Sequence, residues 1–198
     1  MSEKFQGKYR IPSARLQGYN YGQNGAYFIT ICTKHRSHYF GKIISQPGGG
    51  VETQYIASLH ATPIGLVAIE YWEKIPEHFP FVVLDEYRVM PNHIHGIIIL
   101  SKPIVDRVVE THNDASLQDE PYKNKFGPQS GNISSVIRGY KAAVKSFATI
   151  HEIDFGWQPR FHDRIIRDKD ELRRIRKYIA ENPENWEKDK DNNESLYM

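Results

Sequence analysis

The sequence contains a single cysteine, Cys32, which excludes an intramolecular disulfide and any zinc site built from several cysteines. No apolar run approaches the ~20 residues of a membrane-spanning helix, so no membrane partner is expected. The first ten residues, MSEKFQGKYR, also lack the hydrophobic region of a secretory signal. From these absences we expect a cytoplasmic protein, with Cys32 as a small core residue in the strand-like run AYFITICT.

The sequence also has no strong excess of positive or negative charge. The 26 Lys and Arg residues nearly balance the 24 Asp and Glu residues, and the formal net charge is only +2. Overall charge therefore does not identify a nucleic-acid partner, and only local clusters of basic residues can indicate one. What the chain does have is 198 residues, of which 39% are hydrophobic, enough for the core of one domain.

The apolar pattern predicts strands and helices in a mixed order. Strands are expected where β-branched and aromatic residues cluster, and helices where apolar residues recur every three to four positions. The expected strands are 26–33, a short one before the glycines at 48–50, 81–90, 93–100 and part of 157–167, and the expected helices start near Pro63, at 132 and near 168. This order predicts an α+β domain with helices packed on one antiparallel sheet.

One domain is expected to span residues 1–186. Within it, the polar segment 101–132 is long for a loop and is interpreted as a flexible insertion. The charged residues 187–198 are expected to form a tail beyond the domain.

Two histidines stand one residue apart in MPNHIHGIIIL. Side chains alternate along a strand, so His93 and His95 are expected to share one face while Ile94 faces the other. Two neutral imidazoles at this spacing can converge on one metal ion. They can equally be polar residues on a solvated strand, and the spacing alone leaves both interpretations open. His162, in the strand-like RFHDRIIR, is a candidate neighbour of the pair.

A tyrosine and an asparagine stand four residues apart in KYIAENP, near the end of the last expected helix. This spacing places Tyr178 and Asn182 on one helix face. A phenol is a possible nucleophile, and an amide oxygen is a suitable ligand for Mg²⁺ or Mn²⁺. The plainer interpretation is a buried tyrosine followed by an asparagine that ends the helix before Pro183.

Three segments, MPNHIHGIII, WQPRFHDRIIR and YIAENPENW, occur in this order and together resemble one family. They are similar to the HUH single-tyrosine transposases, in particular the REP-associated tyrosine transposases and their insertion-sequence relatives. AYFITICT and SSVIRGYKAAV also match the layout of that family, so the resemblance covers about residues 16–186. The segment 101–132 departs from it, being longer and more acidic than in a minimal member.

The resemblance implies a ferredoxin-like fold and a set of site residues. His93, His95 and Asn182 would hold Mg²⁺ or Mn²⁺, and Tyr178 would be the nucleophile. The implied activity is cleavage and rejoining of hairpin-bearing, palindromic single-stranded DNA through a 5′-phosphotyrosine. Relatives act as monomers or as homodimers, and the sequence contains no clear interface signal. A non-catalytic DNA-binding protein on the same scaffold is the alternative, and an unrelated metal-binding fold is a third.

Basic residues cluster in the last third of the chain, as contacts to DNA phosphates require. Part of the cluster recurs along the expected helix at 132–150, where a solvated helix face is the alternative interpretation. The rest lies around the proposed nucleophile. The residues expected to bind DNA are Arg138, Lys141, Lys145, Arg160, Arg164, Arg167, Arg173, Arg174 and Lys177.

Overall fold

The computed structural model describes residues 4–5, 8–9, 19–47, 55–103 and 130–186. The tail expected at 187–198 lies outside these residues, as does the expected insertion apart from its two ends.

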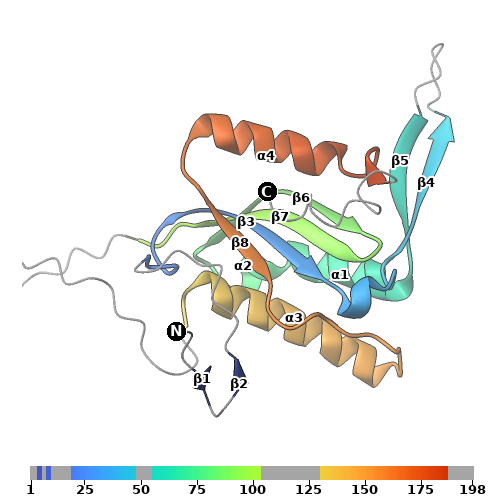
Figure 1. The fold of residues 1–198 in the computed structure, drawn as a ribbon, viewed down its shortest axis with the longest axis horizontal. Coiled ribbons are helices and arrows are strands. Elements are labelled where there is room, and N and C mark those ends of the chain that lie inside the picture. Colours follow the sequence, from blue (N-terminus) through green and yellow to red (C-terminus); the bar gives the residue numbers. More distant parts are fainter. Residues whose placement is uncertain (1–3, 6–7, 10–18, 48–54, 104–129, 187–198) are drawn as a thin grey trace, which may run out of the picture.

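A four-stranded antiparallel sheet forms the centre of the protein (Figure 1). Its strands, in spatial order, are β6 (Val82–Met90), β7 (His93–Leu100), β3 (Gly25–Cys32) and β8 (His162–Ile166). Helix α1 (Pro63–Glu73) connects β3 to β6, and α3 (Ile133–Ile150) lies between β7 and β8. This βαββαβ order defines the ferredoxin-like α+β fold, which confirms the expected fold class.

The helices cover both faces of the sheet (Figure 1). Helices α1 and α3, with the short α2 (Ile75–His78), lie on one face, where the larger core contains Ile29, Ile98 and Trp72. The final helix, α4 (Lys169–Glu181), lies alone on the other face over a small cluster that includes Phe28, Ile97 and Ile179. The sheet therefore separates α4 and its small cluster from the main core.

Side chains cap the N-termini of α1, α3 and α4, close to the helix starts expected near Pro63, at 132 and near 168. The Thr62 hydroxyl accepts a hydrogen bond from the Gly65 amide at 3.2 Å. Pro63 is the first residue of α1, a position where the backbone N–H that proline lacks would have no partner within the helix. Asn132 and Ser135 cap α3 reciprocally, each side chain bonding the other residue's backbone amide. Asp168 caps α4 by accepting from the Glu171 amide at 2.7 Å. The three expected helices are thus confirmed.

One hairpin was not predicted from the sequence, which indicated only its first strand. The strand expected before the glycines is β4 (Gly41–Pro47), but its antiparallel partner β5 (Tyr55–Ala61) was not predicted. The pair forms a separate two-stranded sheet that extends from one end of the domain (Figure 1). Near the N-terminus, β1 (Lys4–Phe5) and β2 (Lys8–Tyr9) form another short ladder.

Alternation along β7 divides its side chains between the two faces. Ile94 and Ile98 pack into the main core, whereas His93, His95 and Ile97 face α4. Gly96 belongs to the core face, where an added Cβ would lie 2.3 Å from Cζ2 of the fully buried Trp72. The absence of a side chain at this position lets the indole pack directly on the strand.

Cys32 was expected to be a core residue, but it is only half-buried. It pairs with His93 in the β3–β7 register, and Ile31 before it is the residue that enters the core. Directly opposed residues point to the same side of a sheet. Cys32 therefore lies on the sheet face that carries His93 and His95, which we call the histidine face. No helix within the described residues is long and apolar enough to span a membrane.

Candidate functional site

Helix α4 presents its apolar stripe to the sheet. Leu172, Ile175 and Ile179 recur at helical spacing and pack on the cluster around Phe28, while the opposite side of the helix is charged and exposed. Tyr178 and Asn182 belong to the stripe, so both are directed at the sheet: Tyr178 is half-buried and Asn182 is fully buried. Asn182 also occupies the C-cap position of α4, so it ends the helix as the plainer interpretation of the KYIAENP segment predicted.

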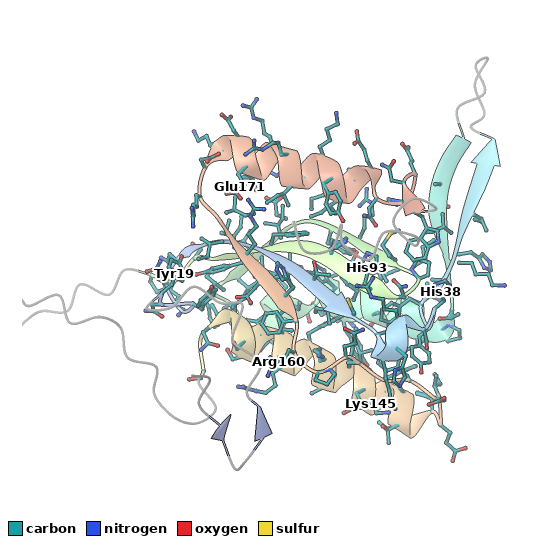
Figure 2. The ribbon with its side chains drawn as sticks, viewed as in Figure 1. Tyr19, His38, His93, Lys145, Arg160 and Glu171 are labelled. Atoms are coloured by element: carbon teal, nitrogen blue, oxygen red, sulfur yellow. The ribbon has the colours of Figure 1, made fainter. Side chains whose placement is uncertain are left out.

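The histidine pair lies beneath this helix, in the same chain. The hydroxyl of Tyr178 is 3.3 Å from Nε2 of His95, and the two rings are 5.3 Å apart. The His93 and His95 rings lie 4.4 Å apart. Figure 2 shows His93 under the C-terminal part of α4. Packing therefore brings together the two motifs that the sequence analysis linked, although 83 residues separate Tyr178 from His95.

Both imidazoles are buried, with exposed fractions of 3% for His93 and 1% for His95. Burial, aided by the Arg36 guanidinium, lowers the pKa of His93 to about 3, and a weaker hydrogen-bonding effect of Asn182 opposes the shift. Burial, with smaller effects of His93 and His162, also lowers the pKa of His95 well below its usual value. Both rings are therefore neutral at physiological pH, the form in which imidazole binds metals.

The donor set fits a divalent cation. Nε2 of His93 is buried and makes no hydrogen bond of good geometry to any described residue. No three His, Cys, Asp or Glu side chains in the described part of the chain are grouped to hold a metal ion. Asn182 supplies a buried amide oxygen close enough to affect the pKa of His93. Two imidazoles and one amide oxygen would leave coordination positions open.

Residues on β3 and in the β6–β7 turn support the two histidines. Oγ1 of Thr30 lies 2.9 Å from Nδ1 of His95, and Oδ1 of Asn92 lies 2.7 Å from Nδ1 of His93. Thr30 and Asn92 are themselves buried. Both residues lie within segments that the sequence analysis singled out, AYFITICT and MPNHIHGIII, but neither was given a role, because the contact of Thr30 with His95 joins positions 65 residues apart.

A second group of residues closes the site on the side of His93. The indole of Trp186 lies between two imidazoles, with ring centroids 6.0 Å from His93 and 5.5 Å from His38. Arg36, in the short 3-10 helix η1 (Lys34–Arg36), has a left-handed backbone with φ of 54° and acts electrostatically on His93. Trp186 is the last residue of the YIAENPENW segment, and the sequence alone indicated no role for it.

His162, a candidate neighbour of the histidine pair from the sequence, lies on the histidine face. It opposes Thr30 in the β3–β8 register, and Thr30 opposes His95 across β7. The three residues therefore form a row across adjacent strands. His162 is close enough to lower the pKa of His95.

Two carboxylate–guanidinium pairs attach α4 to the sheet. Arg176 binds Asp85 through two hydrogen bonds of 2.8 and 2.6 Å, and Asp85 lies at the irregularity in β6 between Leu84 and Tyr87. Near the other end of the helix, Glu171 is 2.7 Å from Arg164 of β8. The pairs join α4 to both edge strands, which limits how the helix can shift over the histidines.

The basic residues expected to bind DNA are distributed over both sides of the molecule. Lys145 and Arg160 lie on the side of α3, opposite His93 and α4 (Figure 2). The Lys141 ammonium donates to the carbonyls of Gln158 and Arg160 at 2.7 and 2.8 Å, and that of Lys145 donates to Phe155. These two lysines therefore hold the segment before β8 against α3, a structural role that the sequence analysis missed.

The basic residues on and near α4 have a different environment. Arg173 pairs with Asp170, and Lys177 lies 3.7 Å from Glu181 on the exposed surface. Arg174 and Arg167 are exposed too, as is Arg138 on α3. DNA binding by any of these residues stays a prediction.

Fold and site together define a ferredoxin-like domain in which a tyrosine-bearing helix lies over a histidine pair. A Haemophilus influenzae protein described only as uncharacterized is 38% identical over 178 residues, covering 89% of this chain and 90% of that protein. The chain belongs to the same family as this protein. No family model matches the sequence.

Among solved structures, the fold resembles that of a REP-associated tyrosine transposase bound to a REP hairpin. The TM-score is 0.54 and the sequence identity 18%, with 89% of this chain and 74% of the other covered. At this identity the likeness establishes a common fold.

Proposed function

We propose that this protein is a metal-dependent transposase that cleaves and rejoins single-stranded, hairpin-bearing DNA. The observation that carries the proposal is the 3.3 Å approach of the Tyr178 hydroxyl to Nε2 of His95. With this contact, Tyr178 would act as the nucleophile next to the proposed metal ligands His93, His95 and Asn182. The fold likeness to a transposase bound to a REP hairpin supports the choice of substrate.

In the proposed reaction, Tyr178 attacks a phosphodiester of a single strand. The phenol loses its proton to solvent, its oxygen bonds to phosphorus, and the bond from phosphorus to O3′ breaks. The departing O3′ takes up a proton from solvent, so the products are a 5′-phosphotyrosine and a strand with a free 3′-OH. The 3′-OH of a second strand then attacks the phosphotyrosine and releases Tyr178. Each step exchanges one phosphate ester for another, so neither needs ATP.

His93, His95 and Asn182 would hold the metal ion, Mg²⁺ or Mn²⁺. The ion would stabilise negative charge on the scissile phosphate as a Lewis acid. The protein contributes rigidity: β7 is hydrogen-bonded on both sides, by β6 and β3, which holds the imidazoles in place. A free phenol has a pKa of about 10, and a cation bound close to the Tyr178 hydroxyl would favour the ionised form.

The test is formation of a covalent protein–DNA adduct. Purified protein is incubated with Mn²⁺ and single-stranded hairpin DNA taken from the sequences flanking its gene, and the products are separated under denaturing conditions. Wild-type protein should form an adduct, and Tyr178→Phe should form none. Tyr71→Phe, on α1 at the opposite face of the sheet, is the matched control and should behave like wild type.

Two results would contradict the proposal. Equal adduct formation by Tyr178→Phe would show that another residue is the nucleophile. Tight hairpin binding without any adduct would favour the alternative, a non-catalytic DNA-binding protein on the same scaffold.

A further inference from the structure

The two histidines are supported in the same way, each through its Nδ1 atom. A neutral imidazole has a hydrogen on one nitrogen and a lone pair on the other. The partner of one nitrogen therefore determines what the other can do. Only an Nε2 atom that carries a lone pair can bind a cation from the α4 side, where the Tyr178 hydroxyl approaches Nε2 of His95.

For His93 the tautomer follows from its partner. Oδ1 of Asn92, 2.7 Å from Nδ1, is a carbonyl oxygen and only accepts. Nδ1 of His93 therefore carries the hydrogen, and the buried Nε2 carries the lone pair. Asn92 is well placed for this role, because its own backbone carbonyl is fixed by the Thr33 amide at 2.9 Å and hydroxyl at 3.0 Å.

For His95 the partner is a hydroxyl, which can donate or accept. If Thr30 accepts from Nδ1, the lone pair is on Nε2, and the Tyr178 hydroxyl donates to it at 3.3 Å. If Thr30 donates instead, Nε2 carries a hydrogen and cannot bind a metal. The first arrangement matches that of His93 and leaves both Nε2 lone pairs available.

We propose that Thr30 and Asn92 are positioning residues that hold His95 and His93 in the Nδ1–H tautomer, with both Nε2 lone pairs directed toward α4. The inference rests on the proposed function, because the use of this arrangement is to bind the divalent cation. Second partners of this kind usually strengthen metal binding by about 10- to 100-fold. Thr30 is 4% exposed and central in the sheet, so it holds the ring with little freedom of its own.

The first measurement is Mn²⁺ affinity of the full chain by calorimetry, without DNA. Thr30→Val keeps the shape and removes the hydrogen bond, and it should weaken Mn²⁺ binding by about 10- to 100-fold. Thr30→Ser keeps the hydroxyl and should bind close to wild type. Thr149→Val is the control, because the Thr149 hydroxyl only bonds the Lys145 carbonyl near the end of α3. Thermal unfolding should show that all three variants are folded.

The second measurement reads the tautomers directly in metal-free wild-type protein, by nitrogen-15 NMR of the imidazoles. Both rings should be Nδ1–H tautomers, and an Nε2–H tautomer at His95 would overturn the inference even if Thr30→Val failed to fold. Equal Mn²⁺ affinity of wild type and folded Thr30→Val would also overturn it, while leaving the proposed function intact. Absence of Mn²⁺ binding by wild type would instead overturn both the inference and the proposed metal site.

Discussion

Tyr178 and His95 meet within one chain, with the tyrosine hydroxyl 3.3 Å from Nε2 of the histidine. The contact requires α4 to lie over the strand that carries the histidines, and its apolar stripe and two ion pairs hold it there. A complete candidate site is thus formed without a second subunit. This arrangement predicts a site that acts in cis, whether or not the protein dimerises.

Mixing two inactive variants tests the cis arrangement. Tyr178→Phe lacks the proposed nucleophile and His95→Ala lacks a proposed ligand, so each alone should form no DNA adduct. If each site uses its own helix, an equal mixture should stay inactive. Recovery of about a quarter of wild-type activity would contradict the prediction, since that is the outcome for random dimers that exchange α4.

The Asp85–Arg176 pair should stabilise the placement of α4 in a pH-dependent way. The Arg176 guanidinium lowers the pKa of Asp85 below its usual value. A carboxyl whose pKa is lowered by folding stabilises the protein above its unfolded pKa of about 3.9, and this contribution disappears as pH falls through the lowered value. Asp85→Asn should therefore reduce the urea midpoint at pH 7, and the reduction should become smaller as the pH falls below about 3.9.

The rate of DNA-adduct formation provides a second test of the Asp85–Arg176 pair. Asp85→Asn should slow adduct formation more than it weakens hairpin binding, because it loosens the helix that carries Tyr178. Asp170→Asn is the control, since its partner Arg173 lies on the same helix and both side chains are exposed. A urea midpoint for Asp85→Asn that differs from wild type equally at pH 7 and at a pH below about 3.9 would contradict the electrostatic explanation.

The basic residues should separate into a structural group and a DNA-binding group. Lys141→Met removes two hydrogen bonds to carbonyls and should lower the free energy of unfolding by about 1–3 kcal/mol. Arg174→Met, at an exposed position of α4, should leave stability unchanged and reduce the salt slope of hairpin binding by about 0.7–0.9. Unfolding in urea and binding at several salt concentrations measure the two effects. A stable Lys141→Met protein would refute the structural role.

Local rules were sufficient to predict the helices and the face that His93 and His95 share. Caps such as Asn132 and the alternation around Ile94 depend on neighbouring residues, so the sequence displays them. The strand β5 was missed because its run precedes a strong helix start at Thr62 and Pro63, which dominated the local pattern.

The parts of the site that the sequence did not reveal depend on packing between distant segments. Thr30 contacts His95 only because β3 and β7 pair in one particular register. Lys141 has the charge of a DNA-binding residue, yet its ammonium group bonds carbonyls 17 and 19 positions away. Composition and spacing carry no information about such partners, and the resemblance to a family supplied only the catalytic set.

The most direct test of the central claim is to locate the DNA on the protein by mass spectrometry. After reaction with hairpin DNA, nuclease and trypsin, the peptide of residues 178–188, YIAENPENWEK, contains one tyrosine. We predict that this peptide carries a nucleotide joined to Tyr178 through its 5′-phosphate. Attachment at any other residue, or an unmodified peptide from protein that has cleaved its DNA, would contradict the assignment of Tyr178 as the nucleophile.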